Sequence, residues 1–237
     1  MASDFFRFKQ FTVWHHRCAM KVGTDGVLLG AWAPLPDNHS PRLLDIGTGS
    51  GLIALMLAQR SGLSPHIDAI DIDADAVAQA TENFALSPWA EQLHAHHSTL
   101  QDWHAEAYDL IVSNPPYFQN SLKNPNQQRA TARHTDTLSY QQLIHHAARL
   151  LQPNGCLALV LPIEAEAEIL ALAEQQGLRP TQLVHVYGKP GKPAKRLLMA
   201  LSPMADSPLP IASDFYIESA DSPRSPEYVE LTKEFYL

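Results

Sequence analysis

The segment LLDIGTGSG, residues 43–51, constrains the fold of this chain more than any other segment. It reads as a short apolar strand, then a turn with glycine at every second position, then the start of a helix. Glycines in such a turn let backbone N–H groups approach a ligand beside the positive end of the helix. A dinucleotide-binding turn would read G-x-G-x-x-G, but the residue three places after Gly49 is Leu52, which argues against NAD binding.

Apolar runs and amphipathic segments alternate along the rest of the chain. The predicted strands cover residues 42–46, 66–71, 92–97, 108–112, 155–161, 181–187 and 196–202. The predicted helices cover residues 50–61, 74–86, 139–151 and 163–176, with Gly177 suited to end the last of them. A further helix is expected through residues 27–32, with Thr24 and Asp25 at its N-cap.

Strands and helices that alternate with short connections predict an α/β three-layer sandwich with a seven-stranded, mostly parallel sheet. The linker GKPGKPA, residues 188–194, is too short and too rich in proline and glycine to hold a crossover helix. The last two strands are therefore expected to form an antiparallel hairpin.

Length and composition limit the class of protein. The 237 residues are expected to form a single domain, with an N-terminal extension over residues 1–33 and a turn-rich C-terminal segment over residues 203–237. A net charge of -8 argues against a general polyanion binder. Cys18 and Cys156 share no metal-ligand spacing and are too few for a disulfide framework. With no signal peptide and no apolar stretch of about 18 residues, a cytoplasmic protein without a membrane span is expected.

Asp71 closes the second predicted strand. In a parallel sheet the end of this strand lies beside the glycine turn, and a carboxylate there can accept both hydroxyl groups of a ribose. Asp73 is a nearby alternative, although its short side chain also suits the N-cap of the helix predicted at 74–86.

The fourth predicted strand is followed by N-P-P-Y, residues 114–117. The Asn114 side-chain oxygen and the Pro115 carbonyl can accept hydrogen bonds from both N–H groups of a planar amino group. These bonds redirect the nitrogen lone pair toward a methyl donor. Consecutive prolines hold the turn rigid, and Tyr117 can stack on the face of a base. A simple strand-ending turn would use similar residues, because Asn and Pro are common in turns. The glycine turn and Asp71 favour the catalytic interpretation.

The glycine turn, Asp71 and N-P-P-Y together resemble the class I S-adenosylmethionine-dependent methyltransferases that act on planar amino nitrogens. The resemblance implies a Rossmann-like fold, S-adenosylmethionine as cofactor, and Asn114, Pro115 and Tyr117 as catalytic residues. The implied cofactor contacts are Lys21, Thr24, Asp25, Asp45, Gly47, Thr48, Gly49, Gly51, Asp71, Ile72, Thr99 and Asn114.

Four further segments narrow the resemblance: FKQF at 8–11, MKVGTDGVLLGAW at 20–32, SPWAE at 87–91 and FYL at 235–237. With them the chain resembles, over nearly its full length, the bacterial tRNA(Val) (adenine-37-N6)-methyltransferase family. The resemblance implies methylation of adenine N6 in tRNA, with tRNA(Val) as partner. Two alternatives remain: methylation of a protein glutamine or another nucleobase amino group, and a non-catalytic RNA-binding module that has kept the fold.

One position departs from the family pattern. Relatives carry an acidic residue after the third strand that accepts a hydrogen bond from the cofactor adenine, and Thr99 aligns there. A hydroxyl can accept the same bond, and Asp102 is an alternative acceptor.

Positive side chains gather in three parts of the sequence, around 7–21, 123–134 and 189–196. We predict that five residues of the first two groups contact RNA phosphates: Lys9, Arg17, Lys123, Arg129 and Arg133. The alternative is that they are ordinary solvated side chains. The histidines lack metal-ligand spacing, so no metal is expected.

Overall fold

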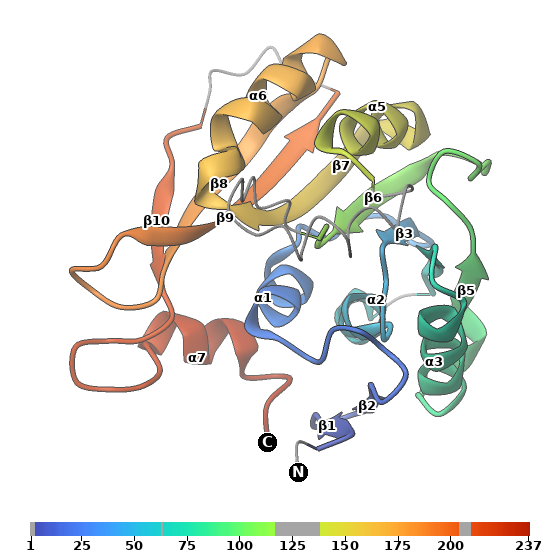
Figure 1. Ribbon diagram of the computed structural model, residues 1–237, viewed down its shortest axis with the longest axis horizontal. Helices are drawn as coiled ribbons and strands as arrows, with labels where there is room; N and C mark the ends of the chain where they lie inside the picture. The colour runs from blue at the N-terminus through green and yellow to red at the C-terminus, as the bar shows by residue number, and fades with distance from the viewer. Residues whose placement is uncertain (1–2, 63, 117–137, 204–209) are drawn as a thin grey trace, which may run out of the picture.

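A mostly parallel sheet forms the middle layer of the protein in this computed structural model, which describes residues 3–62, 64–116, 138–203 and 210–237 (Figure 1). Its strands are β3 (Arg42–Ile46), β4 (His66–Asp71), β5 (Leu93–His97), β6 (Tyr108–Ser113), β7 (Leu151–Pro162), β8 (Arg179–Tyr187), β9 (Ala194–Ser202) and β10 (Ser213–Tyr216). Within the described residues their order across the sheet is β10-β8-β9-β7-β6-β3-β4-β5. Only β9, among these strands, is antiparallel to its neighbours.

The seven predicted strands and the antiparallel β8–β9 hairpin are confirmed, but the predicted strand number is wrong, because β10 adds an eighth strand to the sheet. The extra strand pairs with β8 in parallel over four residues. A run of four residues, SDFY, carries no alternation long enough to predict a strand from sequence.

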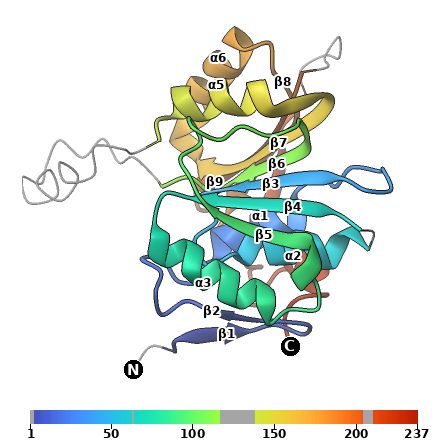
Figure 2. The same cartoon turned by 90° about the vertical axis from the view of Figure 1, so that its right-hand side faces the viewer.

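Helices cover both faces of the sheet, as Figure 2 shows. One face is covered by α1 (Thr24–Trp32), α2 (Leu52–Ser61) and α3 (Ala74–Ala85), and the other by α5 (Tyr140–Leu150) and α6 (Glu166–Gln175). Short 3-10 turns lie at Ala90–Gln92 and Ile163–Ala165. Neighbouring residues of one strand enter different cores: Leu43 packs with the first group and Leu44 with the second. The predicted three-layer sandwich is therefore confirmed.

Local sequence signals begin and end several of these helices. Asp73 caps α3 by accepting a hydrogen bond from the Asp75 amide at 2.9 Å, which confirms the capping role. Ser139 and Gln142 form a reciprocal capping box at the start of α5. After α6, Gly177 adopts φ +71 and its amide bonds to the Glu174 carbonyl, as expected of a glycine that ends a helix.

The predicted cap of α1 is wrong. The N-cap residue is Gly23, whose backbone is extended, and no side chain caps the helix. Thr24 and Asp25 lie inside the first turn instead. Asp25 pairs with Arg196 of β9, a residue 171 positions away that no local pattern indicates.

The two ends of the chain pack against each other, as their positions in Figure 1 indicate. Strands β1 (Phe5–Arg7) and β2 (Thr12–Trp14) form a separate hairpin, and α7 (Pro226–Thr232) precedes the last residues. The Lys9 amide donates to the Phe235 carbonyl at 2.8 Å, and Phe8 stacks on Tyr236. These short elements were not anticipated in the N-terminal extension and the C-terminal segment.

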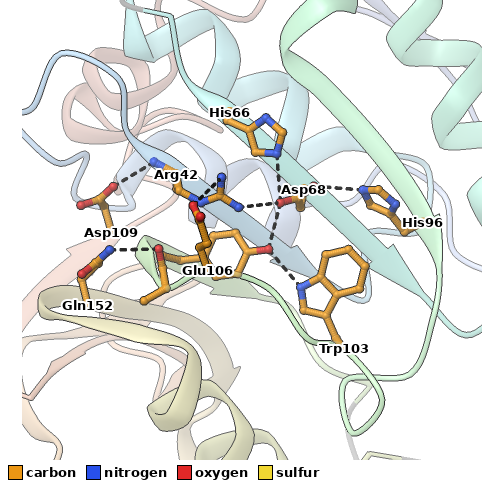
Figure 3. A network of polar contacts seen from close by, with 10 residues as sticks. Arg42, His66, Asp68, His96, Trp103, Glu106, Asp109 and Gln152 are labelled. Carbon is orange, nitrogen blue, oxygen red and sulfur yellow. Dashed lines mark hydrogen bonds and ion pairs between the residues drawn. The ribbon is translucent and has the colours of Figure 1, made fainter.

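A buried carboxylate joins four strands at the amino end of the parallel sheet (Figure 3). Asp68 of β4 is 4% exposed and accepts hydrogen bonds from the Tyr108 hydroxyl of β6 and from Nε2 of His96 of β5, both at 2.9 Å. His66 Nε2 lies 3.2 Å from the carboxylate and the Arg42 guanidinium lies 3.7 Å from it. Since donors from β3, β4, β5 and β6 meet one acceptor, this end of the sheet is cross-linked by side chains.

Gly51→Ala tests the close approach of the glycine turn to α3. Gly51 has φ +81, and an added Cβ would lie 2.4 Å from Phe84 Cε1, so strain and overlap should together lower the free energy of unfolding by about 2 to 4 kcal/mol. Gly62→Ala is the matched control: its φ is +56 but nothing lies within 4 Å of the added Cβ, so a loss of about 1 kcal/mol is expected. Urea unfolding measures both, and equal losses would contradict the proposed contact.

Candidate active site

The glycine turn between β3 and α2 is held open toward the carboxyl edge of the sheet. Gly47 (φ +71) and Gly49 (φ +55) have nothing within 4 Å of the place where a Cβ would stand. Left-handed backbone at both positions explains why glycine occurs there. The first two glycines of the motif thus present bare backbone to open space, whereas Gly51 packs on α3.

Asp71 ties this turn to the end of β4. Its Oδ2 accepts a hydrogen bond from the Gly49 amide at 2.9 Å, and its Oδ1 accepts one from the Asp73 amide, also at 2.9 Å. The Ile70 carbonyl accepts from the Gly47 amide at 2.9 Å and the Thr48 amide at 3.1 Å. Each carboxylate oxygen of Asp71 keeps a second lone pair, so the side chain is oriented and can still accept hydrogen bonds from a ligand.

Two adjoining cavities lie at this edge. The first, of about 230 Å³, is lined by Asp71 and Ile72 at the end of β4 and by Ser98, Leu100 and Gln101 after β5. The second, of about 380 Å³, is lined by Lys21, Thr24 and Asp25 and by Arg196. Both cavities are lined by Met20, Gly47, Gly49, Asn114, Pro115 and Pro116.

Asn114 and Pro115 lie where the two cavities meet. The Ser113 hydroxyl donates to the Ile46 carbonyl at 2.9 Å, which fixes the end of β6 against the end of β3. Asn114 is half-buried and Pro115 is buried directly after this bond. The strand end therefore holds the N-P-P turn beside the glycine turn.

The second cavity has an ion pair at its rim. Arg196 Nε donates to Asp25 Oδ2 at 2.8 Å, and both side chains are about a quarter to a third exposed. The pair joins the first turn of α1 to the start of β9. In the sequence Arg196 belongs only to a positive cluster, and nothing local indicates its partner.

Asp45 lies beneath the glycine turn and lines neither cavity. It is fully buried and accepts a hydrogen bond from the Thr48 hydroxyl at 2.7 Å. Burial raises the pKa of Asp45 to about 7, and the nearby Asp71 carboxylate acts in the same direction. Asp45 therefore supports the turn from behind, while Thr48 faces the second cavity.

Thr99 and Asp102, the two predicted contacts of a cofactor adenine, bind each other. The Thr99 hydroxyl donates to Asp102 Oδ2 at 2.7 Å, and the Asp102 amide donates to Thr99 Oγ1 at 3.1 Å. Neither residue lines either cavity, whereas their neighbours Ser98, Leu100 and Gln101 line the first. The missed wall residues follow β5 directly, but a serine, a leucine and a glutamine form no recognisable motif.

A second group of wall residues, Cys18, Ala19 and Met20, comes from the segment between β2 and α1 and was also missed. Burial together with Asp71 and Asp73 raises the pKa of Cys18 to about 11, so its thiol stays protonated at neutral pH and is a poor nucleophile. No cysteine chemistry is therefore expected in this site.

Of the five predicted RNA contacts, two are described and both have partners within the chain. The Arg17 guanidinium lies 3.6 Å from Glu82 of α3. The Lys9 ammonium donates to the Lys233 carbonyl. Neither residue lines a cavity. Lys123, Arg129 and Arg133, like Tyr117, lie outside the described residues.

In the part of the chain that the structure describes, no cluster of three or more His, Cys, Asp or Glu side chains could hold a metal ion. None of the helices in that part is long and apolar enough to span a bilayer.

Comparison with known proteins identifies the family of this chain. Residues 27–177 match the family model described as methyltransferase small domain. The chain belongs to this methyltransferase family. A protein of Parabacteroides distasonis named tRNA1(Val) (adenine(37)-N6)-methyltransferase is 49% identical over 100% of this chain and 99% of its own length. A Yersinia pestis protein of the same name is 45% identical over 98% of this chain and 93% of its own length.

Solved structures support the methyltransferase fold. A protein of Agrobacterium tumefaciens described as a predicted O-methyltransferase superposes with a TM-score of 0.65 at 18% identity, covering 89% of this chain and 96% of its own. Geranyl diphosphate C-methyltransferase from Streptomyces coelicolor gives a TM-score of 0.55 at 11% identity, covering 76% of this chain and 78% of its own. At such identities the likeness concerns the fold alone.

S-adenosylmethionine is the cofactor that this family and fold imply, and the residues present fit it. The first cavity offers apolar surface from Ile72 and Leu100 beside a carboxylate oriented to accept hydrogen bonds from hydroxyl groups, as an adenosine requires. The second cavity offers Lys21, Thr24 and the Asp25–Arg196 pair, which suit the two charges of an amino acid. Bare backbone at Gly47 and Gly49 leaves room between them.

Asp45→Asn tests the charge beneath the turn. The folded pKa of about 7 lies above the ordinary 3.8, so the neutral carboxyl stabilises the fold at low pH and this contribution is lost as pH rises through 7. An amide mimics the neutral form, so the variant should lose about 2 kcal/mol less of its unfolding free energy between pH 5 and pH 8 than the original chain. Urea unfolding across this range measures the difference. Asp37→Asn, at an exposed position, is the control. Parallel curves of unfolding free energy against pH for Asp45→Asn and the original chain would refute the raised pKa of Asp45.

Proposed function

We propose that this methyltransferase transfers a methyl group from S-adenosylmethionine to N6 of an adenine in tRNA, and that the target is adenine 37 in the anticodon loop of tRNA(Val). The carrying observation is that Asn114 and Pro115 line both adjoining cavities, one bordered by Asp71 and the other by Lys21 and Thr24. The full-length relatives named for this reaction support the choice of substrate. A tRNA substrate agrees with a cytoplasmic location.

The chemical task of the site is to make an exocyclic amino group nucleophilic, because its lone pair is delocalised into the base. The Asn114 side-chain oxygen and the Pro115 carbonyl accept hydrogen bonds from its two N–H groups and turn the lone pair toward the methyl donor. When bound, S-adenosylmethionine would supply an electrophilic methyl group on its sulfonium, and the neutral thioether of S-adenosylhomocysteine would leave with the electron pair of the broken S–CH3 bond. Pro115 and Pro116 restrict the backbone, so the acceptors are oriented before the base arrives. The methylated nitrogen then loses its proton to water without a strong base.

The remaining roles follow the two cavities. We assign Asp71 and Ile72 to the adenosine end of the cofactor, and Lys21, Thr24, Asp25 and Thr48 to its amino-acid end. The adenine reaches Asn114 only when it is splayed out of its stack, and Tyr117 is proposed to cover its face. Lys123, Arg129 and Arg133 remain proposed phosphate contacts. Lys9 and Arg17 are weaker proposals, since each already binds a group of this chain.

Transfer of labelled methyl tests the substrate class. The chain is incubated with tritiated S-adenosylmethionine in three separate reactions, which contain tRNA, DNA or a protein fraction. The RNA is then digested to nucleosides. Label is expected in tRNA as N6-methyladenosine, with unmodified tRNA(Val) the best acceptor. Label found only in protein would overturn the RNA assignment and favour a glutamine substrate, and cofactor binding without any transfer would favour a non-catalytic module.

Asn114→Ala tests the acceptor role. Loss of one pre-oriented hydrogen-bonding group should lower kcat by about 100-fold or more. The affinity for S-adenosylmethionine, measured by calorimetry, should change by no more than about threefold, because other groups hold the cofactor.

Asn154→Ala is the matched control, since this asparagine is exposed on β7. It should leave kcat and cofactor affinity unchanged. An Asn114→Ala enzyme with undiminished kcat would show that the amide does not orient the amino group.

A further inference from the structure

The β8–β9 hairpin carries the third positive cluster of the sequence, whose three lysines have no role assigned so far. It is the orange loop at the left of Figure 1. Tyr187 of β8 pairs with Ala194 of β9, so the residues between them form the tip. Lys189 and Lys192 belong to the tip, and Lys195 follows on β9.

The tip is a rigid turn. The Lys192 amide donates to the Lys189 carbonyl at 3.3 Å, and Gly191 between them has φ +76. With Pro190 before this glycine, the segment has the signature of a type II turn, in which the first and fourth Cα atoms lie within about 7 Å. Pro190 inside the turn and Pro193 directly after it restrict the chain further. Lys189 and Lys192 are therefore held side by side before any partner binds.

The base of the hairpin is also braced. The Ile217 amide donates to the Tyr187 carbonyl and the Glu218 amide to the Gly188 carbonyl, both at 2.9 Å. These bonds connect the hairpin to the segment after β10. A braced arm loses little conformational entropy when it binds, which favours affinity.

The register of the sheet brings the hairpin to the edge where the cavities lie. Arg196 of β9 pairs with Pro162, the last residue of β7, so the tip extends beyond the carboxyl ends of the parallel strands. The same Arg196 lines the second cavity together with Asn114. Lys195 is the neighbour of this arginine, so the three lysines continue outward from the cavity rim.

The charges of the three lysines are not neutralised within the part of the chain that the structure describes. Lys189, Lys192 and Lys195 are exposed, and within that part their ammonium groups form no ion pair or hydrogen bond. The whole chain has only 17 Lys and Arg against 25 Asp and Glu. Three unpaired cations on one hairpin, two at its tip and one on β9, form in an acidic protein a surface complementary to a polyanion.

From the turn, the register and the unpaired charge we propose that the β8–β9 hairpin is a phosphate-binding arm, which grips the backbone of the substrate RNA while the target adenine is held at Asn114. The proposal rests on the proposed function, because it takes the RNA substrate from it. Lysines bind phosphates as point charges and do not read sequence. The arm therefore supplies affinity and position but no choice of base.

A charge-removal experiment tests the arm. In Lys189→Gln/Lys192→Gln the Kd for tRNA, measured by fluorescence anisotropy at about 0.1 M salt, should rise by about tenfold or more, because two phosphate contacts are lost. The slope of log Kd against log salt should fall by about 1.4, at about 0.7 for each contact with a single strand. The kcat at saturating tRNA and the affinity for S-adenosylmethionine should stay unchanged.

Two further variants make the result specific. Arg149→Gln/Arg179→Gln removes the same charge from the opposite end of the strands, where α5 ends and β8 begins, and should leave tRNA affinity and the salt slope as they were. Lys189→Arg/Lys192→Arg keeps the charge and should bind tRNA like the original chain.

Equal Kd and salt slope for Lys189→Gln/Lys192→Gln and the original chain would overturn the proposal, as would equal weakening by the Arg149→Gln/Arg179→Gln control. Failure of the proposed function is seen separately, because the original chain would then transfer no methyl group from S-adenosylmethionine to any tRNA.

Discussion

The hydrogen bond from the Gly49 amide to the Asp71 carboxylate is the interaction on which the site depends. It joins the turn after β3 to the end of β4 across 22 residues of sequence, at 2.9 Å and with a charged acceptor. A charge-assisted bond of this kind is about twice as strong as a neutral one. Because the turn is held by this bond and by the Ile70 carbonyl, the bare backbone of Gly47 and Gly49 forms a fixed wall between two cavities. The N-P-P turn lies against this wall because it follows β6, the strand next to β3.

Two carboxylates of β4 have different roles because their surroundings differ. Asp68, near the amino end, is buried and meets a hydroxyl, two imidazoles and a guanidinium, so its hydrogen-bonding capacity is used within the protein. Asp71, three residues later, is met by two backbone amides and borders a cavity. The first stabilises the sheet and the second can accept from a ligand. In a parallel sheet this difference is expected, since loops at the carboxyl edge leave a crevice.

The sequence predicts what is set by periodicity or by single residues with special backbone geometry. Seven strands, the main helices, the glycine turn and the β8–β9 hairpin are of this kind. Strands β1, β2 and β10 have only three or four residues, too few for alternation to be recognised. The N-cap predicted at Asp25 is wrong, and its ion pair with Arg196 is not predicted because the partner is remote in sequence. The Thr99–Asp102 pair depends on a loop conformation that no pattern encodes. Segments 8–11 and 235–237, which carry part of the family resemblance, meet in space: the Lys9 amide binds the Phe235 carbonyl.

Charge pairing explains how an acidic protein can approach a nucleic acid at one edge. Away from the cavities, Arg42, Arg179 and Lys233 each lie within ion-pair distance of a carboxylate. In each pair the two charges cancel, so the excess carboxylates determine the potential of the surface away from the cavities. That negative potential repels a polyanion. At the carboxyl edge Arg196 is neutralised by Asp25, but the lysines that follow the cavity rim outward are not paired within the described residues. A net charge of -8 and an RNA substrate are therefore compatible. Under the proposed function, the repulsive body would weaken nonspecific contacts, and the unpaired lysines would favour binding of RNA at the edge that holds Asn114.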